Sequence, residues 1–220
     1  MEIKKYKAIF FDVDGTLVNS APGIINGVIY TLKKYGIEPP DDPQSLTCFI
    51  GPPLRESFSK YYNIDESRFL EVEGVFREYY DVKGIFECSM YTGTKRMLRH
   101  LKESGKTLAI ASSKPMRHVS RILERFGIDK CFDYVGAAYI EKGIYEKDDI
   151  IRRAVTSLGL SPQECLMVGD RLYDIEGAHK SGMDCACVLY GFGSEREFEE
   201  YGADYIFGKV SELENFLLEH

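Results

Sequence analysis

Short apolar runs that stop at Asp, Ser or Gly recur along this chain, with helix-like stretches between them. Runs that are apolar throughout are typical of parallel strands, because such strands are buried on both faces. Strands that alternate with helices over residues 91–190 predict a doubly wound α/β sheet. The expected strands are Tyr6–Phe11, Thr107–Ala111, Tyr134–Ala137, Cys165–Val168 and Cys185–Leu189.

Four helices are expected between these strands, and a glycine follows each of them. A helix commonly ends at a left-handed residue, a conformation that glycine adopts most easily. The glycines therefore support the predicted helix ends. The helices are Thr94–Ser104, Pro115–Phe126, Asp148–Leu158 and Tyr173–Ser181.

One interval, residues 18–88, contains no convincing buried strand, and its apolar residues follow helical spacing. Stretches rich in helix breakers flank it at residues 19–22 and 90–93. We therefore expect a discontinuous α/β core of residues 1–17 and 89–220, with a helical domain inserted after the first strand. The expected helices of the insert are Ile24–Tyr35, Leu54–Tyr62 and Glu66–Lys83.

Composition and charge exclude several classes of protein. The 220 residues carry 28 basic and 35 acidic side chains, and the net charge of −7 opposes binding to a nucleic-acid backbone. No apolar run approaches the ~20 residues that a membrane-spanning helix needs. The first residues lack the apolar core of a signal peptide, so we expect a cytoplasmic protein without nucleic-acid or membrane partners.

The six cysteines include no CxxC pair. Cys185 and Cys187 would lie on the same face of a strand, since side chains alternate between the two faces. We expect both to be buried apolar side chains, rather than zinc ligands or partners in a disulfide.

The first predicted strand ends in two acidic side chains, Asp12 and Asp14, within the sequence Asp-Val-Asp-Gly-Thr. In a doubly wound sheet the ligand crevice lies beyond the carboxyl ends of the strands, and both carboxylates can face it while the strand is still extended at Asp12. One carboxylate can attack a phosphoryl group, and the second can protonate the leaving oxygen and then deprotonate a water. The same residues also fit an ordinary strand-end turn, so this motif alone does not decide between the two.

Two more polar residues lie beside predicted strands or helices. Ser112 follows a strand at a place where a helix N-terminus could hold an oxyanion, and it also fits a helix N-cap before Pro115. Lys147 opens a predicted helix, where the helix dipole disfavours a cation, and contact with a phosphate would explain its position. Lys142 is an alternative for the same role.

Asp170 and Asp174 follow another predicted strand and add two acids to the same edge of the sheet. With Asp12 and Asp14 they would form a group of four carboxylates, which repel one another unless a cation or protons intervene. Oxygen ligands beside a phosphate, without His or Cys, suit Mg²⁺ best. The sequence therefore predicts a Mg²⁺ site.

The order of these motifs resembles the haloacid dehalogenase superfamily, and within it the phosphoglycolate-phosphatase-like branch with a helical cap. The resemblance covers nearly the whole chain and implies a Rossmann-like core. It also implies that residues 18–88 are a mobile cap, which closes over the site and selects the substrate. The matching segments are Phe10–Ser20, Gly51–Leu54, Ala111–Pro115, Lys147, Met167–Asp174, Val188–Ser194 and Gly202–Ile206.

This resemblance implies a Mg²⁺-dependent phosphatase that hydrolyses a small phosphorylated metabolite through an aspartyl-phosphate. By the resemblance, Asp12 is the nucleophile and a metal ligand. Asp14 is the general acid/base and offers its backbone carbonyl to the metal. Ser112 and Lys147 hold the transferred phosphoryl group.

The resemblance also makes Asp170 a metal ligand and has Asp174 order the surroundings of the metal. One departure lies at the third motif. Many relatives carry Lys-Pro there, whereas this chain has Lys147 followed by Asp148. The choice between Lys147 and Lys142 therefore stays open at this point.

Two further residues are candidates for contact with the substrate. The pair Lys114-Pro115 resembles the corresponding pair in the relatives, and Lys114 could contact the substrate. Arg55, in the segment Gly51–Arg55, could bind a substrate carboxylate or a second phosphate, although it also fits a solvent-exposed helix arginine. A sugar phosphomutase, a nucleotidase or a pyrophosphatase would share these motifs, and a receiver-like signalling module that accepts a phosphoryl group is the non-enzymatic alternative. We expect a monomer or a homodimer.

Overall fold

The computed structural model describes residues 5–52, 54–139 and 146–220, and the chain forms two compact units. One unit comprises Met1–Val18 with Met90–His220, and the other comprises Asn19–Ser89. Two short strands, β2 (Val18–Asn19) and β3 (Ser89–Met90), pair with each other where the chain passes between the units.

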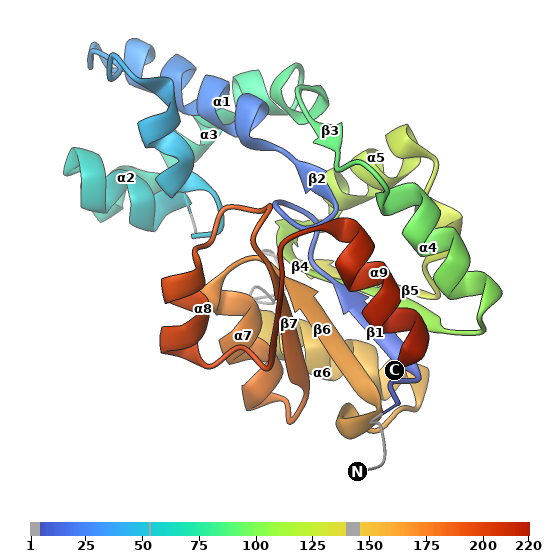
Figure 1. Ribbon diagram of the computed structural model, residues 1–220. Coiled ribbons are helices and arrows are strands. Elements are labelled where there is room, and N and C mark those ends of the chain that lie inside the picture. The colour runs from blue at the N-terminus through green and yellow to red at the C-terminus, as the bar shows by residue number, and fades with distance from the viewer. Residues whose placement is uncertain (1–4, 53, 140–145) are drawn as a thin grey trace. The chain divides into compact units, whose positions relative to one another are not determined.

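The first unit is built on a six-stranded sheet in the order β5-β4-β1-β6-β7-β8, and every neighbouring pair is parallel (Figure 1). This arrangement confirms the predicted doubly wound α/β fold. Because β1 lies between β4 and β6, the residues that follow these three strands meet at one edge of the sheet. The strands are β1 (Ala8–Phe11), β4 (Thr107–Pro115), β5 (Tyr134–Ala138), β6 (Cys165–Gly169), β7 (Asp184–Val188) and β8 (Tyr205–Phe207).

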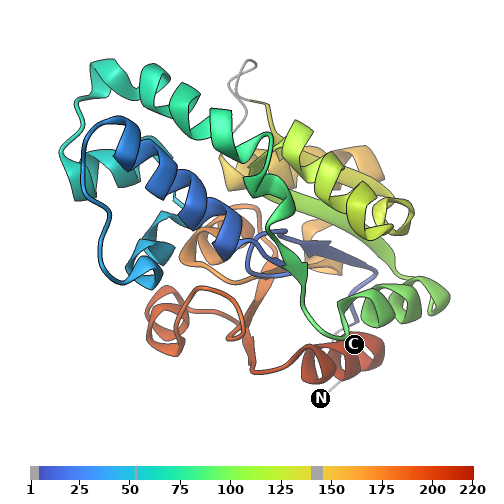
Figure 2. The same cartoon turned by 90° about the horizontal axis from the view of Figure 1, so that it is seen from above.

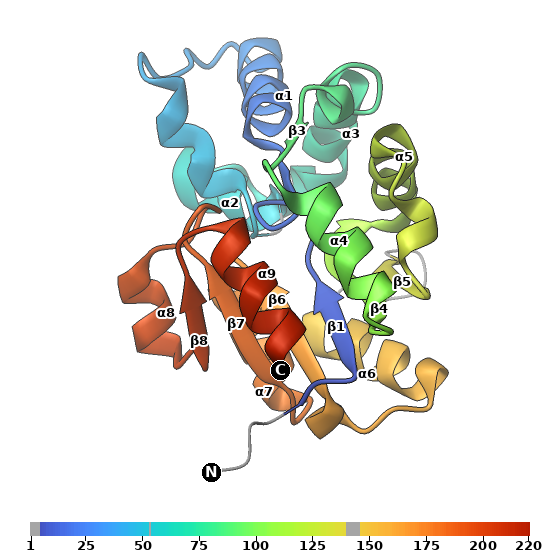
Figure 3. The ribbon, with the colours of Figure 1, turned by 45° about the vertical axis from the view of Figure 1, so that its right-hand side comes forward.

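Helices cover both faces of this sheet (Figure 3). On one face, α6, α7 and α8 pack over a buried apolar cluster that includes Phe10, Met167 and Phe198. On the other face lie α4, α5 and α9, with α4 and α9 side by side. The bounds are α4 (Thr94–Glu103), α5 (Met116–Phe126), α6 (Lys147–Leu158), α7 (Leu172–Lys180), α8 (Glu195–Tyr201) and α9 (Val210–Glu219).

All five predicted strands of the sheet are present with shifted ends, and the sixth strand, β8, was not predicted. β8 has only three residues, all half-buried, so it lacks the apolar run that marks the other strands. The helices α8 and α9 were also missed. β4 runs to Pro115, past its predicted end at Ala111, and this extension matters for the site described below.

Cys185 and Cys187 are core residues, as predicted. Cys185 and Cys187 lie on β7 with their sulfur atoms 4.0 Å apart, and both side chains are fully buried. All six cysteines are free.

The second unit consists of helices between its two short strands. In Figure 2, α1 (Ala21–Lys34) lies alongside α3 (Phe69–Tyr80). The two approach closely because Gly27 has no side chain; a Cβ there would lie 2.6 Å from the ring of Phe76. α2 (Leu54–Tyr62) packs through Phe58 on Phe49, with ring centroids 4.9 Å apart, and Phe49 ends a 3-10 helix, Pro43–Phe49, that itself contacts α1.

No described helix of either unit combines the length and the apolar character that crossing a membrane would require.

Candidate active site

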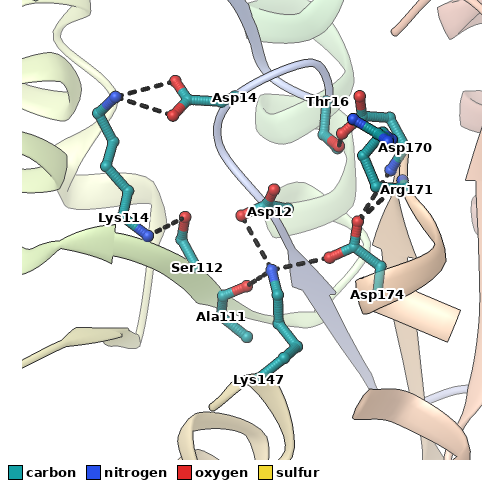
Figure 4. Close-up of polar contacts among 10 residues, drawn as sticks. All are labelled: Asp12, Asp14, Thr16, Ala111, Ser112, Lys114, Lys147, Asp170, Arg171 and Asp174. Carbon is teal, nitrogen blue, oxygen red and sulfur yellow. Dashed lines mark hydrogen bonds and ion pairs between the residues drawn. The ribbon is translucent and has the colours of Figure 1, made fainter. Parts of the chain in front are cut away.

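Four of the candidate residues gather at the carboxyl ends of the central strands (Figure 4). Asp12 directly follows β1, and Asp170 directly follows β6. Lys147 is the first residue of α6, and Asp174 lies in the first turn of α7. Because β1 and β6 are neighbours, the topology alone brings the two strand-end aspartates together.

Lys147 stands at the centre of this group. Its Nζ atom lies 3.1 Å from Oδ1 of Asp12 and 2.7 Å from Oδ1 of Asp174, and it donates a hydrogen bond of 3.0 Å to the carbonyl oxygen of Ala111. Only 6% of the Lys147 side chain is exposed. An ammonium has three protons to donate, so these three contacts use its whole capacity.

Asp174 also closes the turn between β6 and α7. Its Oδ2 atom accepts hydrogen bonds of 3.1 Å from the backbone N–H groups of Asp170 and Arg171. The carboxylate of Asp170 accepts a hydrogen bond from the hydroxyl of Thr16 to Oδ1, at 3.3 Å, and one from the backbone N–H of Phe192 to Oδ2, at 2.8 Å.

These last two contacts were not predicted. Thr16 belongs to the Asp-x-Asp-Gly-Thr motif, but no role was assigned to it, and Phe192 comes from the loop after β7, whose position depends on the fold. Gly15 completes the approach: its φ of +79° is left-handed, and a Cβ there would lie 2.0 Å from Oδ2 of Asp170. Glycine is therefore required at this position.

Burial and mutual repulsion shape the charges of the carboxylates. Burial raises the pKa of Asp12 to about 6, although the charge of Lys147 works in the opposite direction. Burial, followed by the charges of Asp174 and Asp12, raises the pKa of Asp170 well above its ordinary value. For Lys147, burial tends to lower the pKa, but the charges of Asp12 and Asp174 outweigh it and the pKa is raised.

Asp14 corrects one prediction from the sequence. Its carboxylate does not join the other three; both of its oxygens contact Nζ of Lys114, at 3.1 and 2.8 Å. The alternation of a strand fails here because β1 ends at Phe11 and the chain bends at Val13, so Asp14 no longer belongs to the strand. The structure therefore gathers three carboxylates, not four, and it pairs Lys114 with Asp14 (Figure 4).

Ser112 corrects a second prediction, that it could be a helix N-cap. It is a residue of β4, and α5 begins only at Met116, so Ser112 is not a helix N-cap. The side chain is buried and hydrogen-bonds to Asp12, which lowers the pKa of that carboxyl and partly offsets the effect of burial. Ser112 therefore lies directly beside the acidic group, which consists of Asp12, Asp170 and Asp174.

This chain is similar in sequence and in structure to known proteins. A family model described as haloacid dehalogenase-like hydrolase matches residues 9–188. The chain belongs to this family. The match spans both the strand-end aspartates and the inserted helical unit.

Three relatives of this haloacid dehalogenase-like hydrolase are similar to it over nearly their whole length. A 5′-nucleotidase of Pseudomonas aeruginosa is 35% identical over 98% of this chain and 97% of that protein. The crystal structure of a predicted phosphatase from Clostridium acetobutylicum has a TM-score of 0.93 and 40% identity, over 98% of this chain and all of the other. A predicted phosphoglycolate phosphatase from Haemophilus somnus has a TM-score of 0.81 and 26% identity, over 94% of this chain and 96% of the other. The suspected family is confirmed, and the chain is a phosphoric monoester hydrolase.

The acidic group of this hydrolase fits a divalent cation. Asp12, Asp170 and Asp174 each offer a carboxylate oxygen, and these oxygens all lie within 4.8 Å of one another. Oδ1 of Asp12 and Oδ1 of Asp174 are buried and each contacts Nζ of Lys147, and a carboxylate oxygen that accepts one such contact keeps a second lone pair for a metal. A donor set made only of oxygen suits Mg²⁺.

Two candidates remain. Arg55 is an exposed residue in the first turn of α2, in the second unit. Lys142 lies outside the described residues, as does Pro53 of the segment Gly51–Arg55.

Proposed function

We propose that this chain is a Mg²⁺-dependent phosphatase that hydrolyses small phosphate monoesters through an aspartyl-phosphate on Asp12. One observation carries the proposal: the carboxylate of Asp12 lies at the carboxyl end of the central strand, with 14% of its side chain exposed, in contact with a buried cation, Lys147. A nucleophile that must approach an anionic phosphate needs such compensation of charge.

In the first step, a carboxylate oxygen of Asp12 attacks phosphorus, and the bond between phosphorus and the ester oxygen breaks. Asp14 gives its proton to the leaving oxygen, which departs as an alcohol. In the second step, a water attacks phosphorus of the aspartyl-phosphate while Asp14 takes a proton from that water. Inorganic phosphate leaves, and the carboxylate of Asp12 is restored.

The remaining residues of the group bind the phosphoryl oxygens or prepare the site. Ser112 and Lys147 are proposed to hold the transferred group. Asp12, Asp170 and Asp174, with the backbone carbonyl of Asp14, are proposed to hold Mg²⁺, which supplies positive charge for the phosphoryl oxygens. The rest of the stabilisation comes from positions fixed before the substrate arrives.

Nucleoside 5′-monophosphates are the first substrates to test. The relative that supports this choice is named a 5′-nucleotidase and is similar over the full length of the chain. Phosphoglycolate is the second, since a solved structure of the same fold is described as a predicted phosphoglycolate phosphatase at lower identity.

We further propose that the helical unit, Asn19–Ser89, is the cap that selects the substrate, with Arg55 as a contact to a distal anion. Arg55→Ala should then lower kcat/KM strongly for substrates with a second anionic group and little for a plain aryl phosphate. Lys60→Ala, on the same helix, is the matched control. An equal loss for both substrate classes would assign Arg55 a structural role.

Phosphate release over a panel of substrates tests the proposal. The panel contains nucleoside monophosphates, phosphoglycolate, pyrophosphate and sugar phosphates, each with Mg²⁺ and with a chelator. Release of free phosphate that requires Mg²⁺ is expected. An isomeric sugar phosphate without free phosphate would indicate a mutase. Stable phosphorylation without turnover would indicate the receiver-like alternative.

A further inference from the structure

Among the ion pairs of the described residues at the site, the one between Lys114 and Asp14 is the most buried after those of Lys147. Nζ of Lys114 lies 2.8 Å from Oδ2 and 3.1 Å from Oδ1 of Asp14. Only 6% of the Lys114 side chain and 17% of the Asp14 side chain are exposed. Lysine side chains are rarely buried to this extent unless they are paired, so the contact with Asp14 helps to hold Lys114 in this position.

An irregularity in β4 places Lys114. Along β4 and β5 the pairing runs in register to Ser112 and Ala137, and the next pair is Pro115 with Ala138. Two residues of β4, Ser113 and Lys114, therefore stand opposite no residue of β5. Bulges of this kind redirect side chains and are common beside active sites. Here the bulge coincides with the ion pair to Asp14.

The net charge of the group formed by Asp12, Asp170, Asp174 and Lys147 indicates a role for the ion pair between Lys114 and Asp14. Three carboxylates, those of Asp12, Asp170 and Asp174, face one ammonium, that of Lys147. When all are ionised the sum is −2, which one divalent cation balances. A fourth carboxylate would leave excess negative charge where an anionic phosphate has to bind.

Asp14 is near enough to supply that fourth carboxylate. It is two residues from Asp12, and its negative charge contributes to the raised pKa of Asp12. Burial, followed by the charges of Asp170 and Asp14, raises the pKa of Tyr91, so both carboxylates act on the hydroxyl of this tyrosine.

We propose that Lys114 is a positioning residue that holds the carboxylate of Asp14 outside the metal site, so that the site keeps three carboxylates and Asp14 stays available as the acid/base. This inference rests on the proposed function. Its specific content is that the metal affinity of the site depends on a contact between two side chains that do not themselves bind the metal through their charged groups.

A double-mutant cycle on Mg²⁺ affinity tests this, with calorimetry on the full chain in the absence of substrate. Lys114→Met keeps the length of the side chain and removes its charge, so Asp14 is free to join the three carboxylates. Mg²⁺ should then bind about tenfold more tightly, within the range of coupling between neighbouring groups, and kcat should fall. In the double variant Lys114→Met/Asp14→Asn this gain should disappear.

The cycle separates positioning from simple electrostatics. If Lys114 and Asp14 act only as fixed charges, Asp14→Asn lowers Mg²⁺ affinity by the same factor with or without Lys114, and the two effects add. The inference requires that Asp14→Asn matter much more in the Lys114→Met background. Lys114→Arg, which keeps the charge, should restore the wild-type affinity. Lys114→Gln serves in place of Lys114→Met if that variant does not fold.

Lys102→Met is the matched control. Lys102 contacts both oxygens of Asp133, at 2.8 and 2.7 Å, in the same unit but before the start of β5, away from the site. It should leave Mg²⁺ affinity unchanged. Additive effects in an enzyme that binds Mg²⁺ would overturn this inference alone, whereas a wild-type protein that binds no Mg²⁺ would overturn the proposed metal site together with it.

Discussion

Nζ of Lys147 lies 2.7 Å from Oδ1 of Asp174, and both side chains are almost completely buried. The same ammonium contacts Asp12, so one cation compensates two carboxylates that are remote in the sequence. Lys147 lies at the start of α6, where the helix dipole disfavours a cation. The carboxylates are thus the physical reason for a buried lysine at this position.

Removal of this charge should destabilise the protein. Lys147→Met is expected to lower the free energy of unfolding by about 3–5 kcal/mol without metal, the range for losing one partner of a buried ion pair. Mg²⁺ should recover part of the loss, because it compensates the same carboxylates. Denaturant titrations with a chelator and with Mg²⁺ measure both effects. Lys180→Met, in an exposed pair with Glu176, is the control, and equal stability of the two variants would contradict the account.

Mg²⁺ should stabilise the wild-type protein against heat. At about a hundredfold excess over Kd, binding adds about 2.7 kcal/mol, which corresponds to about 5–10 °C in Tm for a chain of this size. Asp170→Asn should abolish this shift without a large loss of metal-free stability, because it removes a buried carboxylate with a raised pKa. Thermal melts with Mg²⁺ and with Na⁺ at equal ionic strength check both statements. A full Mg²⁺ shift in Asp170→Asn would exclude this carboxylate as a ligand.

Gly177 has no side chain, and this allows the aliphatic part of Lys147 to pack against α7. A Cβ at this position would lie 2.5 Å from Cγ of Lys147, so Gly177→Ala should displace the lysine and lower both kcat and stability. The sign is the test, since Gly→Ala inside a helix ordinarily stabilises by up to about 1 kcal/mol. Gly74→Ala, in α3 with open space around it, should show that ordinary gain. A stabilised and active Gly177→Ala variant would contradict the packing described.

Glu214 should make stability depend on pH. It joins α9 to α4 through Arg96, at 2.8 Å, and His100, at 2.7 Å, and only 6% of its side chain is exposed. The hydrogen bond from Arg96 lowers the pKa of Glu214, against the effect of burial. Its contribution is therefore present above the ordinary Glu pKa of about 4.3 and is lost as the pH falls through the lowered pKa.

Glu214→Gln tests this. At neutral pH the variant should lose about 1.5–3 kcal/mol, the value of hydrogen bonds to a charged group, and the difference from wild type should vanish in acid. Glu103→Gln, in an exposed pair with Arg99, should match the wild type throughout. Denaturant titrations over a series of pH values measure the difference, and a gap that persists after the carboxyl is protonated would refute the linkage.

The sequence was sufficient for five of the six strands of the sheet and for bringing Asp12 and Asp170 together. Buried parallel strands carry a strong apolar signal, and β1, β4 and β6 all showed it. The carboxyl ends of neighbouring parallel strands must meet, so Asp12 and Asp170 could be placed together without coordinates.

What the sequence could not predict depends on where extended backbone stops. β1 ends before Asp12 and β4 continues past Ser112, and these two facts decide where Asp14, Ser112 and Lys114 point. The contact of Phe192 with Asp170 needs the loop after β7 to return to β6, which no local pattern records. The ion pair between Lys114 and Asp14 was missed for the same reason.

The phosphoenzyme itself tests the central claim most directly. With an aryl phosphate, whose leaving group needs no proton, Asp14→Asn should form the aspartyl-phosphate but break it down slowly, since the amide cannot take a proton from the attacking water. Mass spectrometry of this variant, quenched in acid after mixing with substrate and Mg²⁺, should find one phosphoryl group on the peptide that contains Asp12 and nowhere else. The further change Asp12→Asn should remove it. A phosphoryl group on another residue, or wild-type turnover by Asp12→Asn alone, would contradict the account.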